Sequence, residues 1–330
     1  IDVEYVPDAD SSIFENFVRQ ITSNESGPQP EIYEHLKWLI GYSLQGNPKQ
    51  KIFIILYGEH GFNGKSLLMN TISDILDYYA VTMDKSVVLE SQKKTAGSHS
   101  TEICQLENCR FGILSDTKEN SVIDDGQVKQ LTGITDKLSV REIFGKQKEF
   151  KPMFVPWIGS NHPVTVNLAD KAMKERLVIF PFELSFVDEP SESFERHNDA
   201  GLADKFKNNK QGILKWLIDA SIYYNNFPDK PLPQILKDAK EIYNRKVNPH
   251  CGFLDKYFIR YEKGCPEYNE KRFSRTQLFD MFDEYKRENH IRNIKKSKSE
   301  LEFDKMLEGF KEGSKKMYKG LEAIDDDFDE

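Results

Sequence analysis

The chain has 330 residues, with 46 Lys and Arg against 54 Asp and Glu, and a formal net charge of −8. This length allows a sizeable core in two or three domains, and the acidic balance argues against a protein coated in nucleic acid while leaving room for a narrow basic channel. No apolar run is long enough to cross a bilayer and the acidic start, IDVEYVPDAD, is unlike a signal peptide, so we expect no membrane partner.

Two helical patterns open the chain, around residues 13–21 and 32–44, and the polar breaker SNESGPQP separates them. Residues 52–56, IFIIL, follow as a strand that is apolar at every position, which is typical of a parallel sheet covered on both faces. Behind the strand, apolar residues from Leu67 to Leu76 recur at helical spacing. This order predicts the start of an α/β domain.

A glycine-rich loop, GEHGFNGKS, joins that strand to that helix. We expect it to cradle the phosphates of a nucleoside triphosphate with Gly58, Gly61, Asn63, Gly64, Lys65, Ser66 and Leu67. Lys65 would reach the β- and γ-phosphates, and Ser66 would hold Mg²⁺. Glu59 stands where the standard pattern has glycine, so either the loop is one residue longer or Gly61 makes the turn. The alternative is a glycine-rich turn that binds nothing.

Two later strands end in polar residues that suit phosphate chemistry. The strand at 111–114 is followed by Asp116, which we expect to hold Mg²⁺ with the loop serine, and by Glu119, our candidate for the base that activates water. A strand at 154–158 leads to Asn161, whose amide could position the attacking water beside the γ-phosphate. The alternatives are a surface acid after a strand and an ordinary turn asparagine.

A basic hairpin and a single arginine complete the candidate site. Residues 136–151 alternate apolar positions around a glycine tip, and their candidate DNA contacts are Arg141, Phe144, Lys146 and Lys148. Arg176 stands just before a fourth strand at 177–180, where it could act as an arginine finger on the transferring phosphoryl group. A solvated lysine-rich turn and an arginine that caps a helix are the alternatives.

The pattern changes after Phe186. A polar loop leads to an amphipathic helix at 213–224 and then to the proline-rich connector NNFPDKPLP. Further helical patterns follow at 253–261 and 276–287, separated by short polar stretches. This part of the chain is compatible with a small helical or winged-helix domain.

Four cysteines in a chain of this length indicate a reducing, intracellular compartment rather than a disulfide framework. Cys104 with Cys109, and His250 with Cys251 and Cys265, form two loose sets whose spacing could hold zinc. Ordinary apolar or surface thiols are the alternative.

The order of these elements resembles superfamily 3 helicases, and most of all the primase–helicases of poxviruses, other large DNA viruses, phages and plasmids. The segments that carry the resemblance are LIGYSLQG (39–46), LYGEHGFNGKS (56–66), CRFGILSDTKE (109–119), VKQLTGITDKLSVRE (128–142), PWIGSNHP (156–163) and KERLVIFPF (174–182). The likeness covers residues 30–185 well and the rest of the chain more loosely.

The resemblance implies an AAA+-like P-loop ATPase that uses ATP and Mg²⁺, forms a hexameric ring and moves along single-stranded DNA. In it Asn161 is the γ-phosphate sensor, Arg176 reaches the ATP of a neighbouring subunit, and the 136–151 hairpin grips DNA. Related proteins carry a primase domain before this region, which fits a chain that starts at Ile1 without Met. The resemblance also implies that this chain acts in the host cytoplasm or at a viral replication site.

The resemblance also gives a domain plan. Its expected parts are a helical collar for ring assembly at 1–48, the ATPase core at 49–190, a helical lid and linker at 191–234, a C-terminal helical or winged-helix-like domain at 235–320 and an acidic tail at 321–330. Besides Glu59, two positions depart from the family pattern: Glu175 stands where relatives often have a second arginine, and Thr117 follows Asp116 in place of a second acid.

Three functions stay open at this level. The first is an ATP-driven replicative DNA helicase, and the second is a ring-forming replication scaffold whose ATPase drives assembly instead of unwinding. The third is a P-loop ATPase or kinase that acts on a partner other than nucleic acid. The Ser-Asn motif followed by Arg176 argues against a kinase, because it implies ATP hydrolysis between subunits.

Overall fold

The computed structural model describes residues 1–90, 98–141, 145–167, 170–288, 296–311 and 317–324. The chain divides into two compact units, Ile1–Tyr243 and Asn244–Glu330. The first unit holds the central sheet and all of the residues expected at the nucleotide site, so it is described first.

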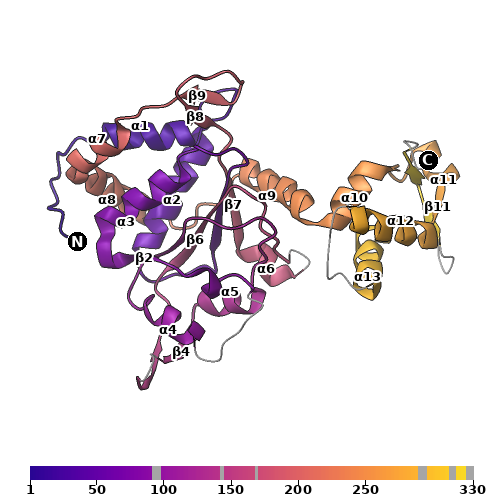
Figure 1. Cartoon of the computed structure of the whole chain (residues 1–330), viewed down its shortest axis with the longest axis horizontal. Helices are drawn as coiled ribbons and strands as arrows, with labels where there is room; N and C mark the ends of the chain where they lie inside the picture. Colours follow the sequence, from indigo (N-terminus) through magenta and orange to yellow (C-terminus); the bar gives the residue numbers. More distant parts are fainter. Residues whose placement is uncertain (91–97, 142–144, 168–169, 289–295, 312–316, 325–330) are drawn as a thin grey trace. The chain divides into compact units, whose positions relative to one another are not determined.

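Five parallel strands form the central sheet of the first unit (Figure 1). Their order across the sheet is β2 (Ala80–Thr82), β3 (Phe111–Leu114), β6 (Val155–Ser160), β1 (Phe53–Tyr57) and β7 (Leu177–Pro181). The register pairs Leu56 of β1 with Gly159 on one side and with Phe180 on the other. Every residue of β1, β3 and β6 is buried. The predicted α/β fold class with a parallel sheet is confirmed.

Helices pack around this sheet, and two small ribbons stand apart from it (Figure 1). The helices in the described part of this unit are α1 (Ser12–Ile21), α2 (Pro30–Leu44), α3 (Lys65–Leu76), α4 (Ser98–Cys104), α5 (Asp125–Leu131), α6 (Lys171–Arg176), α7 (Leu202–Asn208), α8 (Lys210–Asn226) and, as far as Tyr243, α9 (Gln234–Val247), with 3₁₀ turns at Asp77–Tyr79 and Lys85–Val87. The ribbons are the antiparallel pair β4 (Leu138–Arg141) and β5 (Gln147–Phe150), and the parallel pair β8 (Ser185–Val187) and β9 (Glu195–His197). An antiparallel hairpin is therefore present where the alternation at 136–151 predicted one.

The first two helices belong to the same core as the sheet. In α1 the buried side chains are Phe14, Phe17, Val18 and Ile21, the spacing of one helix face. Helix α2 packs closely against α8: a Cβ atom on Gly41 would lie 2.0 Å from a backbone oxygen of α8, so no larger residue fits there. Helices α1 and α2 are therefore part of the same unit as the sheet, and Phe17 and Ile21 of α1 lie against Gly64, which follows β1.

The second unit has a core of its own, rich in aromatic residues such as Phe253, Phe282 and Phe303. Its described elements are α10 (Pro249–Tyr257), β10 (Phe258–Arg260), α11 (Pro266–Glu270), β11 (Arg272–Ser274), α12 (Arg275–Glu288), α13 (Lys296–Met306), a 3₁₀ turn at Glu308–Phe310, β12 (Met317–Lys319) and β13 (Leu321–Ala323). The helix predicted over 253–261 is wrong in its last turn. Phe258–Arg260 is a strand instead, because it pairs antiparallel with β13, a partner more than 60 residues away.

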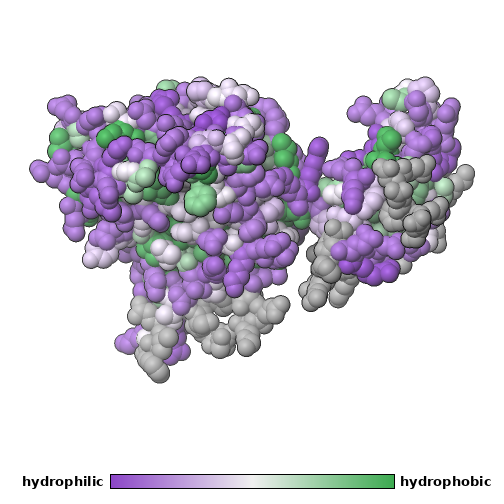
Figure 2. Space-filling model, turned by 45° about the horizontal axis from the view of Figure 1, so that its top comes forward, coloured by the Kyte–Doolittle hydropathy of each residue, from purple (hydrophilic) through white to green (hydrophobic). Residues whose placement is uncertain are grey.

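The surface carries no broad apolar face in the view of Figure 2. Hydrophilic residues dominate the larger unit there, and hydrophobic residues form small, separated patches. None of the helices in the described ranges is long and apolar enough to cross a membrane.

His35 of α2 is a buried histidine that makes the stability of the fold depend on pH. Its ring stacks between Trp38 and Phe180, and Nδ1 has no hydrogen-bond partner among the described residues. Burial, followed by the nearby charge of Lys230, lowers the pKa of His35 to about 4. The ring is therefore neutral in the folded chain at neutral pH.

We expect acidification to destabilise the chain through His35. Between about pH 6.5 and 4 the unfolded chain binds a proton that the folded chain excludes, so the free energy of unfolding falls as pH falls. Between pH 7 and 4.5 the free energy of unfolding of the wild type should fall by about 2 kcal/mol more than that of His35→Phe, measured by urea unfolding. The exposed-site control His197→Gln should keep the wild-type slope; an equal slope in His35→Phe would contradict the assignment.

Candidate functional site

The phosphate loop leaves the carboxyl end of β1 at Tyr57 and ends where α3 begins at Lys65. Its positive φ values fall at Phe62 (57°) and Gly64 (82°), whereas Gly61 has an ordinary φ and open space beside it. A bulky residue with φ in the left-handed region is uncommon and marks a locally constrained backbone. The loop is therefore one residue longer than the standard pattern, and Gly61 does not make the turn.

Asn63 closes this loop from inside. It is buried, and its Nδ2 donates to the carbonyl of His60 at 2.6 Å and to that of Gly58 at 3.4 Å. At Gly58 a Cβ atom would lie 2.2 Å from the Asn63 amide nitrogen and 2.7 Å from the carbonyl oxygen of Phe182. Glycine is needed at 58 because of this close approach.

Lys65 and Asn161 meet at the carboxyl edge of the sheet although 96 positions separate them. The Nζ of Lys65 donates to Oδ1 of Asn161 at 2.7 Å and to the carbonyl of Gly58 at 3.3 Å, and the lysine is 4% exposed. Burial lowers the pKa of Lys65 to about 8, against the opposing charge of Asp116. A buried ammonium group held only by neutral oxygens is poised to receive an anion.

The candidate metal residues lie at the same edge. Asp116 follows β3 and Ser66 lies in the first turn of α3, and both are exposed. A carboxylate and a hydroxyl are the hard oxygen donors that Mg²⁺ prefers, so these residues fit that metal. Glu119 is exposed three residues beyond Asp116.

Thr117 has a function that the sequence did not reveal. It is buried, and its hydroxyl lies 2.5 Å from Oγ of Ser160, which in turn donates to the carbonyl of His162 at 2.6 Å. These bonds tie the end of β3 to the end of β6 directly beside Asn161. The sequence did contain a signal for this contact: a short hydroxyl side chain shortly after an apolar strand, which is able to form a hydrogen bond to the end of the adjacent strand.

A cavity of about 660 Å³ opens beside the phosphate loop. The loop and Asn161 line one side, α1 contributes Ile13, Asn16, Phe17 and Gln20, and the region from β8 to α7 contributes Phe186, His197, Asn198, Asp199, Leu202 and Lys205. Its size suits a nucleotide, and its mixture of apolar walls with a few amides is typical of a small-molecule site. The contribution of α1 was missed, since its apolar face alone indicated only a core helix.

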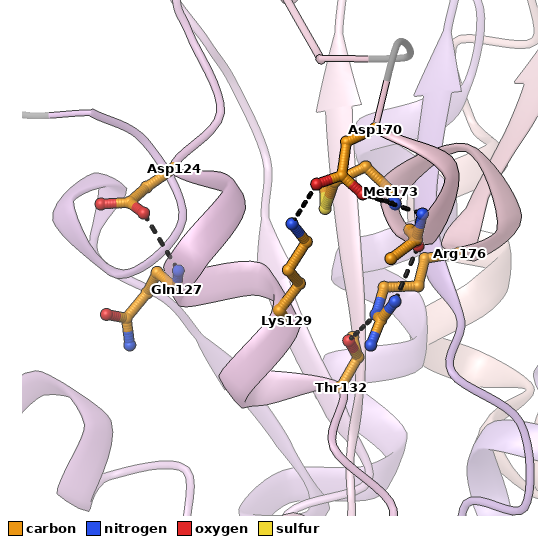
Figure 3. A network of polar contacts seen from close by, with 8 residues as sticks. Asp124, Gln127, Lys129, Thr132, Asp170, Met173 and Arg176 are labelled. Carbon is orange, nitrogen blue, oxygen red and sulfur yellow. Dashed lines mark hydrogen bonds and ion pairs between the residues drawn. The ribbon is translucent and has the colours of Figure 1, made fainter.

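Arg176 lies at the opposite edge of the sheet. It immediately precedes Leu177, which pairs with Phe53, the first residue of β1, whereas the phosphate loop follows the last residue, Tyr57. The strand between the two ends is about 13 Å long at about 3.3 Å per residue. Within one chain, Arg176 and Lys65 are therefore not brought together. Figure 3 shows Arg176 with its actual partners, at the end of α6 and beside α5.

The hairpin residues expected to contact DNA have different surroundings. Lys146 is exposed, Arg141 donates through Nε to the carbonyl of Gly145 at 3.0 Å, and Lys148 forms an ion pair with Glu107 at 2.8 Å. Phe144 lies outside the described residues. Lys146 is therefore open to solvent on the described part of the hairpin, whereas Lys148 is already paired with a carboxylate.

The described residues contain no group of three or more His, Cys, Asp and Glu side chains that could hold a metal ion. All four cysteines are free thiols, and Cys104 and Cys109 are buried. Burial raises the pKa of the Cys109 thiol to about 12. These observations favour ordinary thiols over the zinc alternative.

Three viral proteins named "Putative helicase" have segments similar to this chain. They are 022R of Frog virus 3 (isolate Goorha), 29% identical over 146 residues; 184R of Invertebrate iridescent virus 6, 28% over 165; and V13 of Sputnik virophage, 24% over 161. The matches cover 43%, 49% and 46% of this chain but 15%, 17% and 20% of those proteins. The expected resemblance to helicases of large DNA viruses is confirmed.

Among solved structures, the apo C-terminal region of NrS-1 is 18% identical with a TM-score of 0.48, over 73% of this chain and 53% of that one. A ligand-bound JCV helicase is 10% identical with a TM-score of 0.31, over 71% and 61%. Both TM-scores are below 0.5, so the fold is taken from this chain's own sheet. No protein-family model matches the chain.

We expect the two loop glycines to differ sharply in stability. A Cβ on Gly64 would lie 2.5 Å from Ile21 and 3.2 Å from Phe17 of α1 at a φ of +82°, so Gly64→Ala should lower the free energy of unfolding by about 2 kcal/mol or more. Gly61→Ala has open space and an ordinary φ, so it should be neutral or more stable by about 0.5 kcal/mol. Urea unfolding of both variants measures the contrast, and equal effects would contradict this loop conformation.

Proposed function

We propose that this chain is the motor of an ATP-dependent replicative DNA helicase of the viral or phage primase–helicase type. In this proposal the subunits form a ring and hydrolyse ATP at the interfaces between neighbours. The ring moves along single-stranded DNA and unwinds the duplex. The sequence similarity to viral helicases supports the class of protein. The observation that carries the mechanism is the buried contact between Lys65 and Asn161 beside a nucleotide-sized cavity, with Arg176 on the far edge of the sheet.

In the proposed site the triphosphate replaces internal partners of Lys65. The ammonium group gives up its bonds to Asn161 and Gly58 and turns to the β- and γ-phosphates, which satisfies the buried charge with an anion. Asn161 is then free to hold the attacking water by its amide, as the γ-phosphate sensor. Exchange of one partner for another couples nucleotide binding to the orientation of Asn161.

Other residues take supporting roles in the proposal. Mg²⁺, held by Ser66 and Asp116, would neutralise the charge that develops on the phosphates. Backbone N–H groups around Asn63 and Gly64 and the start of α3 would hold the phosphate oxygens. Glu119 remains our candidate for the base that takes the proton from water.

The base and sugar have room in the remainder of the cavity. Ile13 and Phe17 from α1 and Phe186 of β8 give apolar walls, and the amides of Asn16 and Gln20 are suited to hydrogen bonds with a ring edge. This arrangement supports ATP as the ligand of the same cavity that the phosphate loop borders. It also makes the first helix part of the nucleotide site.

A shared site between subunits follows from the strand directions. Because Arg176 cannot reach the phosphate loop of its own chain, a role as an arginine finger requires a second copy that presents its amino edge to this cavity. Assembly into a hexameric ring would supply that copy at every interface. The β4–β5 hairpin, with Lys146 exposed, is the proposed contact to the DNA backbone.

Lys65→Ala should abolish ATP hydrolysis and strand displacement, because the variant loses the cation that binds the transferred phosphate. Lys146→Ala should keep basal ATPase activity but lose most of its stimulation by single-stranded DNA and its unwinding. The exposed lysine Lys207 gives the matched control, and Lys207→Ala should behave as wild type. Full DNA stimulation and unwinding in Lys146→Ala would contradict the hairpin assignment; ATP hydrolysis by the wild type without any strand displacement would favour the scaffold.

The affinity for ATP should depend on pH through Lys65. Its pKa is about 8 in the free site and must rise when an anionic phosphate binds, so binding favours the protonated amine. The dissociation constant should be constant below about pH 8 and rise by up to about tenfold per pH unit above it. Calorimetry of Lys65→Arg, whose charge does not titrate, should show no such rise between pH 7.5 and 9.5; the same rise in that variant would exclude Lys65 as its source.

A further inference from the structure

Two contacts join α5 to α6 next to Arg176 (Figure 3). One is a hydrogen bond from Arg176 to Thr132, the C-cap residue that follows α5, and the other is an ion pair between Lys129 of α5 and Asp170. Asp170 also caps α6, accepting from the backbone N–H groups of Ala172 and Met173 at 2.8 and 3.2 Å. The helix that ends in Arg176 is thus held at both of its ends by contacts that involve α5.

Thr132 is placed to fix the plane of the guanidinium group. Its hydroxyl donates to the carbonyl of Val128 at 2.7 Å, which leaves the oxygen to accept from Nε of Arg176 at 3.0 Å. Nη1 of Arg176 donates to the carbonyl of Ala172 at 2.7 Å. Thr132 is 7% exposed and Arg176 8%, so water competes weakly for these bonds. One edge of the guanidinium is held, and Nη2 has no partner among the described residues.

Helix α5 leads directly into the hairpin. After Thr132 only residues 133–137 separate α5 from β4, whose pairing with β5 forms the element proposed to contact DNA. A displacement of the hairpin is therefore transmitted over a short distance to the hydroxyl that holds Arg176. The function proposed above gives no role to Thr132 or Lys129.

We propose that Thr132 is a positioning residue for Arg176, and that α5 thereby couples the DNA hairpin to ATP hydrolysis in the neighbouring subunit. This inference rests on the proposed function and adds its regulation. An arginine side chain without such a bond samples several rotamers, so its terminal nitrogens are in the productive orientation for a smaller fraction of the time. DNA on the hairpin sets the position of α5, and α5 sets the orientation of Arg176.

The first test is the steady-state ATPase of Thr132→Val, which removes the hydroxyl and keeps the shape. We expect kcat in the presence of oligo(dT) to fall about tenfold, while KM for ATP and the affinity for oligo(dT) stay within about twofold of wild type. Thr132→Ser, which retains the hydroxyl, should restore kcat. Lys129→Gln breaks only an ion pair whose side chains are 33% and 31% exposed, so this variant should fold as wild type and lose part of the DNA stimulation.

Thr22 provides a matched control. It is the C-cap residue of α1 as Thr132 is of α5, is buried, and donates to the carbonyl of Val18 at 2.8 Å, but it bonds to no arginine side chain among the described residues. Thr22→Val should therefore leave kcat unchanged. An equal loss of kcat in Thr22→Val and Thr132→Val would overturn the inference, because it would trace the effect to the loss of a helix-end hydroxyl alone.

The second test asks on which subunit Thr132 acts. Thr132→Val and Lys65→Ala subunits are mixed before assembly, so that an intact phosphate loop can face an intact Arg176 from its neighbour. We expect activity several-fold above the mean of the two pure variants. Activity equal to that mean would overturn the inference, because it would place the effect of Thr132 within its own chain.

The outcomes also separate this inference from the function on which it rests. A wild-type chain without ATPase activity would overturn the proposed function. Wild-type ATPase activity stimulated by DNA, together with the same activity and stimulation in Thr132→Val and Lys129→Gln, would overturn only the coupling through α5.

Discussion

The parallel pairing of β1 with β6 on one side and β7 on the other determines where each candidate residue can act. Since all three strands run in the same direction, the phosphate loop and Asn161 leave the sheet at its carboxyl edge, and Arg176 enters it at the amino edge. No adjustment of side chains within one chain brings these groups to the same phosphate. The proposed site shared between subunits satisfies this constraint, and the proposed ring would supply the second subunit.

Burial at the carboxyl edge gives the candidate site its electrostatic character. Among the described residues, Lys65 donates to two neutral oxygens, and Thr117, Ser160 and Asn161 form a compact polar cluster at the ends of β3 and β6. Electrostatic interactions are stronger in buried surroundings. The attraction between the Lys65 ammonium and an incoming phosphate would therefore be more favourable than at an open surface. Helix α1 also encloses this site, because its Phe17 and Ile21 lie against Gly64 of the loop.

Strong local patterns could be predicted from the sequence, and pairings between distant segments could not. The apolar run at 52–56 and the strand at 111–114 were found within a residue of their observed bounds, because burial on both faces leaves a continuous apolar signal. β2 was missed because an edge strand of three residues, Ala80–Thr82, carries too little pattern. The partners of Arg176 were missed too: Thr132 lies 44 residues earlier, and only the packing of α5 on α6 brings the two together. The irregular position Glu59 could be noticed in the sequence, but the left-handed conformation of Phe62 that accommodates it could not.

The central claim is that one subunit completes the nucleotide site of the next. The most direct measurement is mass photometry of the chain with single-stranded DNA and a non-hydrolysable ATP analogue, followed by electron microscopy of the main species. We expect a closed ring, near 230 kDa for about six copies of the 38.3 kDa chain, with Arg176 of one subunit at the phosphate loop of its neighbour. A chain that hydrolyses ATP while it stays monomeric would contradict the shared site. A ring in which Arg176 faces away from every phosphate loop would contradict it as well.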